Sequence, residues 1–181
     1  MRQNFHAIGA IVAAMWLLFL LNWLSPFDLN QWGLRPRSIG GLLGVPLMPF
    51  LHASWGHLIG NTIPLIILLL LLVGSRANPW AVVAFLVVVG GMLLWIVGRP
   101  YVHIGASNLV FGLSSFLVVV GFRERRPTAI AVAVVVAIFY GGTMLSGIIP
   151  RWGSSTSWDG HLCGLVAGVA AGTLFSERPR K

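Results

Sequence analysis

Residues 57–74 read HLIGNTIPLIILLLLLVG, and this stretch decides the class of fold. A helix needs about 20 mostly apolar residues to cross the hydrocarbon core of a bilayer, at roughly 1.5 Å of rise per residue. The stretch contains no Asp, Glu, Lys or Arg, and its histidine and asparagine, His57 and Asn61, lie in its first turns. It therefore predicts a membrane-spanning helix that begins with polar side chains.

Further apolar stretches of the same kind lie before and after it, and none contains an acidic or basic residue. In the whole chain of 181 residues, 57% are hydrophobic and only 9% are charged, whereas about a quarter of the residues of a soluble domain are charged. A soluble fold could not hide this much apolar surface. The sequence thus predicts an all-α membrane protein, a single domain over residues 1–181 with six transmembrane helices, at 5–24, 57–74, 80–98, 107–121, 128–149 and 160–175.

Basic residues are distributed unequally between the two sides of such a bundle. The side with both termini carries Arg2, Arg76, Arg123, Arg125, Arg126, Arg178, Arg180 and Lys181, and the other side carries Arg35, Arg37, Arg99 and Arg151. The richer side faces the cytoplasm, so both termini are predicted to be cytoplasmic. The basic residues form no continuous stripe, so nucleic acid is not an expected partner. Tryptophans would mark the outer interface at Trp23, Trp32, Trp55, Trp95, Trp152 and Trp158, and the inner one at Trp80.

The connection over residues 25–56 is long and still apolar, and Pro26, Pro36, Pro46 and Pro49 divide it into short pieces. Such a composition predicts a long loop between helices one and two that lies in the membrane interface. The fourth helix, 107–121, is expected to be only about 22 Å long, so its start should lie below the outer surface beside a water-filled pocket.

Four glycines follow one another at intervals of four in the sixth helix, at Gly160, Gly164, Gly168 and Gly172. Small residues at this spacing let two helix backbones touch in lipid. We expect this glycine face to meet the face of the fourth helix that carries Ser107, Phe111 and Ser115.

The polar groups that enter the bilayer are the candidates for chemistry, because such groups are costly there. His57, Asn61, Ser107 and His161 all lie near the outer starts of helices two, four and six, so the topology brings them to one depth. A serine needs a neighbouring base, and a base inside the bilayer must here be a histidine. Asp159 is two residues from His161 and points to another face, which favours a Ser–His dyad over a triad.

Three ordered motifs carry a resemblance to a known family. His52-x4-His57-x3-Asn61, Gly105-Ala106-Ser107 and His161-x2-Gly164-x3-Gly168 resemble the signature stretches of rhomboid proteases, over about residues 33–172. The resemblance implies a rhomboid-like bundle with a bacterial-type six-helix core, in which Ser107 is the nucleophile and His161 the base. It also implies that His57, Asn61 and the backbone N–H of Ser107 stabilise the oxyanion. The sequence departs from the family at Asn108, where glycine is usual.

Taken singly, these polar residues also have structural interpretations. His57 and Asn61 could be interhelical hydrogen-bonding residues, and Ser114 and Ser115 are expected to bond to carbonyls of their own helix. His52 is expected to have a structural role, and His103 to be a loop residue separated from the fourth helix by Gly105. Phe111 should pack under His161 or simply belong to the core. Asn108 either tolerates a left-handed backbone, as glycine would, or supplies a further donor.

The sequence therefore predicts an intramembrane serine endopeptidase that cuts transmembrane protein substrates within the lipid bilayer, in the inner membrane of the cell. It requires no cofactor and no metal, and a metalloprotease is rejected because no H-E-x-x-H motif occurs. The alternatives are a transporter or channel, which should show intramembrane charges and two similar halves, and an inactive rhomboid-like binding protein, which should lack the serine or the histidine.

Overall fold

The computed structural model describes residues 2–150 and 156–177. A long helix lies over each of the six predicted stretches, and no end differs from its expected position by more than three residues. The long helices are α1 (Arg2–Leu24), α3 (Trp55–Val73), α4 (Pro79–Val97), α5 (Ser107–Glu124), α6 (Pro127–Gly147) and α7 (Trp158–Phe175). Trp152, which was expected at the outer interface, falls outside the described residues.

Local capping explains where three of these helices begin. Ser54 accepts a hydrogen bond from the backbone N–H of His57 at 3.2 Å and so caps α3. Asn78 caps α4 in the same way, with Pro79 in the first helical position, where its missing N–H costs nothing. Ser157 accepts from the N–H of Gly160 at 3.2 Å at the start of α7. These caps set the register of the helices that carry His57 and His161.

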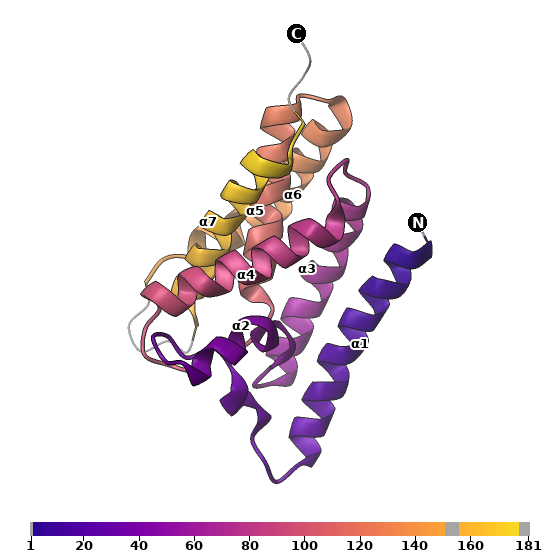
Figure 1. The fold of residues 1–181 in the computed structure, drawn as a ribbon. Coiled ribbons are helices and arrows are strands. Elements are labelled where there is room, and N and C mark those ends of the chain that lie inside the picture. The colour runs from indigo at the N-terminus through magenta and orange to yellow at the C-terminus, as the bar shows by residue number, and fades with distance from the viewer. Residues whose placement is uncertain (1, 151–155, 178–181) are drawn as a thin grey trace.

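The helix α5 lies at the centre of the bundle, between α4, α6 and α7 (Figure 1). Of the 18 most apolar consecutive residues of α5, 72% are buried inside the protein, whereas the share is 17% for α1 and for α6. Five helices in the described part of the chain are long and apolar enough to cross a membrane, namely α1, α3, α4, α5 and α6. The glycines of α7, together with Asp159 and His161, make it less apolar than these.

The segment between α1 and α3 consists of short helical pieces, as its prolines suggest. They are η1 (Leu29–Trp32), η2 (Gly40–Leu43), α2 (Gly44–Leu47) and η3 (Met48–Phe50). This segment lies at the end of the bundle opposite to the start of α1 and the end of α7 (Figure 1). Leu34 pairs with His103 through two backbone hydrogen bonds of 2.9 and 2.8 Å, which tie the segment to the loop before α5.

The expected length of the fourth helix is wrong, and charged residues lie at helix ends just outside three of the predicted stretches. The helix α5 continues past Gly121 to Glu124, so it measures roughly 27 Å instead of about 22 Å. Three of the long helices also contain charged residues, because α1 begins at Arg2, α5 ends with Arg123 and Glu124, and α7 includes Asp159 in its first turn. Hydrogen bonds stabilise the charged end of α5. Glu124 is buried and accepts from Arg126, while Arg123 donates to Ser176 at 2.8 Å.

The glycine face of α7 packs on α5, as expected, and of the three expected α5 residues Ser115 lies in the contact row. A Cβ added at Gly164 would overlap the carbonyl oxygen of Asn108, and one at Gly168 would overlap the Ser115 hydroxyl. One at Gly172 would meet Val119, whereas Gly160 faces its own capping Ser157 and Leu94 of α4. The α5 row therefore runs through Asn108 and Ser115, and Ser107 and Phe111 lie beside it.

Candidate active site

Ser107 is the first residue of α5 and is half-buried. The chain reaches it through Gly105, whose φ of +103° is a conformation that side-chain-bearing residues rarely adopt. A Cβ at Gly105 would also overlap the imidazole of His57, so glycine is required there twice over. Ala106 supplies no side-chain cap, and the first intrahelical bond runs from Val110 N–H to Ala106 O. The backbone N–H of Ser107 is thus one of the unpaired donors at a helix start.

His161 stacks on Phe111, which lies one turn along α5 from Ser107. The two ring centroids are 4.1 Å apart and the ring planes differ by 8°. Nδ1 of His161 lies 2.9 Å from the carbonyl oxygen of Gly147, at the end of α6. Because a carbonyl only accepts, Nδ1 must carry the proton, and in a neutral imidazole Nε2 then keeps its lone pair. In the described residues no hydrogen bond occupies Nε2, so this nitrogen is available as a base.

Gly147 is a site residue that the sequence did not reveal. It acts through its main-chain carbonyl, and any residue type would offer the same atom. The glycine itself is explained by space, since a Cβ there would lie 2.5 Å from Phe111 and 3.1 Å from Nδ1 of His161. The role that an aspartate has in a triad, holding the imidazole tautomer, is here taken by a helix-terminal carbonyl that needs a partner anyway.

His57 and Asn61 lie together on α3, next to the loop that leads to Ser107. Nδ2 of Asn61 donates to the carbonyl oxygen of His57 at 2.8 Å, which fixes the carboxamide and leaves its second N–H free. The His57 ring lies against the backbone of Gly105, two residues before Ser107. The structure thus places the His57 ring next to the loop that leads to α5, with Asn61 one turn further along α3.

His52 is 1% exposed and packs edge-on against His57, with 4.9 Å between ring centroids. Its Nδ1 donates to the carbonyl oxygen of Phe50 at 3.3 Å, and its buried Nε2 has no hydrogen-bond partner in the described structure. Burial, reinforced by the neighbouring His57, lowers the pKa of His52 from 6.5 to about 4. The ring is therefore neutral at physiological pH, and its edge-on contact helps to hold the His57 ring in place.

His103 lies in the loop before α5 and is buried, with both of its ring nitrogens in use. Nε2 lies 3.0 Å from the carbonyl oxygen of Arg99, and Nδ1 lies 2.7 Å from the hydroxyl of Ser157. An imidazole that is occupied on both sides has no lone pair to offer to a serine. His103 is therefore a structural residue of the loop that carries Ser107.

Asp159 is committed to Arg99 and not to His161. Its carboxylate accepts from the backbone N–H of Arg99 at 2.8 Å, from Nε at 3.3 Å and from Nη2 at 3.1 Å, and it lies 3.1 Å from the hydroxyl oxygen of Ser157. No hydrogen bond joins Asp159 to His161 among the residues described. This ion pair ties the loop before α5 to the start of α7. The sequence held a signal for it, because Arg99 and Asp159 are opposite charges on two loops of the same side.

Asn108 neither adopts a left-handed backbone nor serves as a donor to the oxyanion; it donates to nearby carbonyls instead. It lies within α5, and its φ is not positive, since the only described non-glycine residues with positive φ are Arg37 and Arg125. Its Nδ2 donates to the carbonyl oxygens of Gly160 at 2.9 Å and of Gly90 at 3.4 Å. The amide is thus a donor to neighbouring helices and is directed away from an oxyanion beside Ser107.

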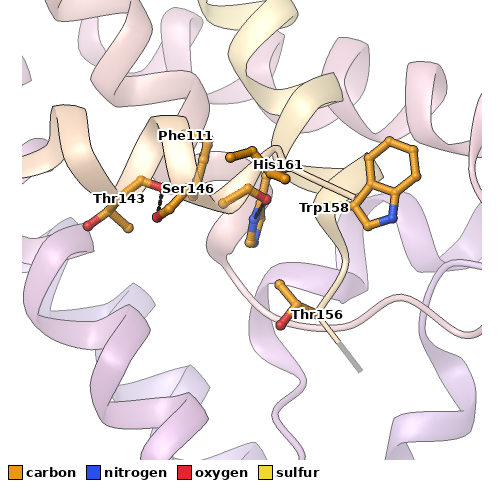
Figure 2. A pocket seen from close by; sticks show the side chains of 8 residues that line it. Phe111, Thr143, Ser146, Thr156, Trp158 and His161 are labelled. Carbon is orange, nitrogen blue, oxygen red and sulfur yellow. Dashed lines mark hydrogen bonds between the residues drawn. The ribbon is translucent and has the colours of Figure 1, made fainter. Parts of the chain in front are cut away.

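A hollow of about 100 Å³ opens next to His161. Side chains from α5, α6 and α7 gather around the imidazole, with Thr143 and Ser146 on one side and Trp158 on the other (Figure 2). The hollow is large enough for a few water molecules. The hollow is lined by His161 and Phe111 but not by Ser107, which lies one turn before Phe111 on α5.

Comparisons with known proteins match the chain to a family model and to relatives of mycobacteria. The model of the Rhomboid domain matches residues 40–178. An uncharacterized protein of Mycobacterium tuberculosis is 42% identical over 184 residues, covering 96% of this chain and 76% of that protein. An uncharacterized protein of Mycobacterium leprae is 38% identical, covering 96% of this chain and 72% of that protein.

Proposed function

The chain belongs to the rhomboid family, and from this premise we propose that it is an intramembrane serine protease that hydrolyses peptide bonds in or near transmembrane segments of membrane proteins. The observation that carries the proposal is the state of His161. Its Nδ1 is held by the Gly147 carbonyl, and it stacks on the residue one turn from Ser107 with Nε2 free. A dyad needs a neutral base whose Nε2 can take the serine proton, and this tautomer supplies it.

In the proposed reaction, the Ser107 hydroxyl attacks the carbonyl carbon of the scissile peptide while Nε2 of His161 takes its proton. The resulting imidazolium keeps its Nδ1–H bond to Gly147 and gives the Nε2 proton to the leaving amine, which leaves an acyl-enzyme. A water molecule from the hollow then repeats the two proton transfers and releases the carboxylic acid. No acidic residue takes part, because Asp159 is bound to Arg99.

The tetrahedral oxygen formed in each step needs donors placed in advance. The unpaired backbone N–H of Ser107, at the positive end of the α5 dipole, supplies one. The ring of His57, which lies against Gly105, and the second N–H of Asn61, one turn further along α3, supply the others. Asn108 is left out of this set because its amide is engaged elsewhere.

We also propose that α7 crosses the membrane as the sixth span. Its glycine face lies on α5, so its lower hydropathy is compensated by contact with protein instead of lipid. Both termini then lie in the cytoplasm of an inner-membrane protein, as the excess of basic residues on that side predicts. The segment between α1 and α3 would lie in the outer interface.

Substrates would enter sideways from the lipid near the outer half of α6. All buried residues of α6, namely Ala129, Ala133 and Val136, lie in its inner half, so its outer half is more exposed up to Gly147, whose carbonyl holds His161. An extended backbone must reach Ser107, so cleavage should favour small residues and helix-destabilising sequence near the outer end of a substrate helix.

The test is cleavage of a model transmembrane substrate in liposomes that contain the purified full chain, with products identified by mass spectrometry. Ser107→Ala is the matched control, since it removes one oxygen. Cleavage by the parent protein and none by the variant supports the proposal. A folded parent protein that cuts no transmembrane substrate would instead be an inactive rhomboid-like binding protein.

A further inference from the structure

Asn108 directly follows the proposed nucleophile, yet its side chain forms hydrogen bonds with two other helices. It is buried, and both hydrogens of its Nδ2 are used, one on Gly160 of α7 and one on Gly90 of α4. A buried amide whose donors are all satisfied by fixed main-chain carbonyls is held in one orientation.

On the basis of the proposed function, we propose that Asn108 is a positioning residue that locks Ser107 in register with His161 through its hydrogen bond to the Gly160 carbonyl.

The first argument is adjacency along both chains. Asn108 follows Ser107, and Gly160 precedes His161, so the 2.9 Å bond joins the immediate neighbours of the two reacting side chains. Consecutive Cα atoms are about 3.8 Å apart. Only one such step separates each end of the bond from the nucleophile or the base, and little backbone is left that could absorb a shift.

The second argument is that Asn108 contacts α7 at two points one turn apart. Its side chain binds the carbonyl of Gly160, and its own carbonyl occupies the position that a Cβ of Gly164 would take. His161 lies in the turn between these two glycines. Asn108 therefore holds the turn of α7 that carries the base, against both sliding and rotation.

The third argument is that the other contacts around the pair act further along the chain. The Arg99–Asp159 ion pair and the His103–Ser157 hydrogen bond join the loop before α5 to the start of α7, four or more residues before Ser107. The Phe111–His161 stack is apolar and tolerates lateral movement, and the Nδ1 bond of His161 leads to α6. Within the described chain the next side-chain hydrogen bond from α5 to α7 is that of Ser115 to the Leu165 carbonyl, at 2.9 Å. Ser115 is eight residues from Ser107, or about 12 Å along the helix.

Loss of the tie should act on turnover. A misplacement of about 1 Å in a reacting group can cost on the order of 10²-fold in rate. Asn108→Ala should therefore lower kcat by roughly 10²-fold, with KM for a model transmembrane substrate unchanged within about threefold. The rate at which an alkyl fluorophosphonate labels Ser107 should fall in parallel, since this reagent needs the dyad but not the substrate site.

Ser115→Ala is the matched control, because it removes a tie of equal length between the same two helices away from the dyad. Its thermal stability in detergent should fall about as much as that of Asn108→Ala, while its kcat should stay within about threefold of the parent value. Equal losses of kcat in both variants would overturn the proposal, since any loosening of α5 against α7 would then suffice.

A double variant separates positioning from packing. The three nearest atoms to a Cβ added at Gly90 all belong to the Asn108 amide, the closest at 2.5 Å. Gly90→Ala should thus destabilise the parent protein, but in the Asn108→Ala background its methyl group enters the space that the amide has vacated. The double variant should regain stability over Asn108→Ala, and its kcat and labelling rate should stay low because the hydrogen bond is still absent.

The outcomes are distinct. Recovery of kcat together with stability in the double variant would show that Asn108 only fills space, and full activity of Asn108→Ala would also overturn the inference. If neither Asn108 variant folds, the amide is required for the bundle itself and the specific proposal is wrong. Failure of the proposed function would look different, because the parent protein would then neither cleave nor be labelled at Ser107.

Discussion

His103, four residues before Ser107, and His161, which stacks on Phe111 one turn after it, lie in opposite situations. Each has one ring nitrogen against a main-chain carbonyl, Arg99 for His103 and Gly147 for His161. At His103 the second nitrogen is taken by Ser157 at 2.7 Å, whereas within the described residues no hydrogen bond occupies the second nitrogen of His161. The difference teaches that the partner of the second nitrogen, and not proximity to a serine in the sequence, distinguishes a structural histidine from a base.

The largest effect should come from removing His161, the histidine with the unoccupied nitrogen, or the serine that it would activate. His161→Ala removes the base, and Ser107→Ala removes the nucleophile. Each should lower turnover by roughly 10⁶-fold, so that the remaining activity falls to the background of a proteolysis assay. Circular dichroism and thermal unfolding in detergent are the control, and a folded His161→Ala protein that still cuts would show that another group serves as base.

The next effect concerns the donors beside the dyad. Asn61→Ala and His57→Ala each remove one oxyanion donor and should cost about 10²–10³ in kcat, or roughly 2.7–4 kcal/mol, with little change in KM. His57→Ala also uncovers the Gly105 backbone, so Asn61→Ala is the cleaner variant. Unchanged kcat in both would leave this pair as interhelical hydrogen-bonding residues.

A smaller effect, on stability more than on chemistry, should follow from changes beside the occupied histidine. Arg99→Ala leaves the buried carboxylate of Asp159 without its main partner, which should lower the free energy of unfolding by about 1.5–3 kcal/mol. Turnover per folded molecule should fall less than for Asn61→Ala. A melting temperature equal to that of the parent protein would contradict this account of the loop.

The smallest effect is expected at His103 itself. His103→Gln keeps a donor and an acceptor in place of the ring and should retain activity within about tenfold, or ~1.4 kcal/mol, of the parent protein. Kinetic assays in liposomes at matched protein content measure this. A loss as deep as that of His161→Ala would mean that the occupied nitrogens of His103 rearrange in the working enzyme.

Much of the architecture could be predicted from hydropathy and spacing, because lipid leaves few choices for a spanning chain. The six apolar stretches mark the six long helices. The four glycines spaced four residues apart indicate the face of α7 that packs on α5. The placement of His57 next to the loop that leads to α5, with Asn61 one turn further along α3, follows from the topology alone.

What could not be predicted depends on main-chain atoms and on rotation about a helix axis. The Gly147 carbonyl leaves no trace in residue identity. The α5 row on α7 runs through Asn108 and not Ser107, because the Asn108 amide fits into the gap above Gly90 and reaches Gly160. Such a fit between three helices is a property of the packed bundle, and no single helix reveals it.

The most direct test of the central claim is the rate at which an alkyl fluorophosphonate labels Ser107 in the detergent-purified full chain, compared between His161→Ala and His103→Gln. The account predicts labelling of the parent protein and of His103→Gln at similar rates, and none above the Ser107→Ala background for His161→Ala. Labelling of His161→Ala at the parent rate, or its loss in His103→Gln alone, would contradict the assignment of His161 as the base.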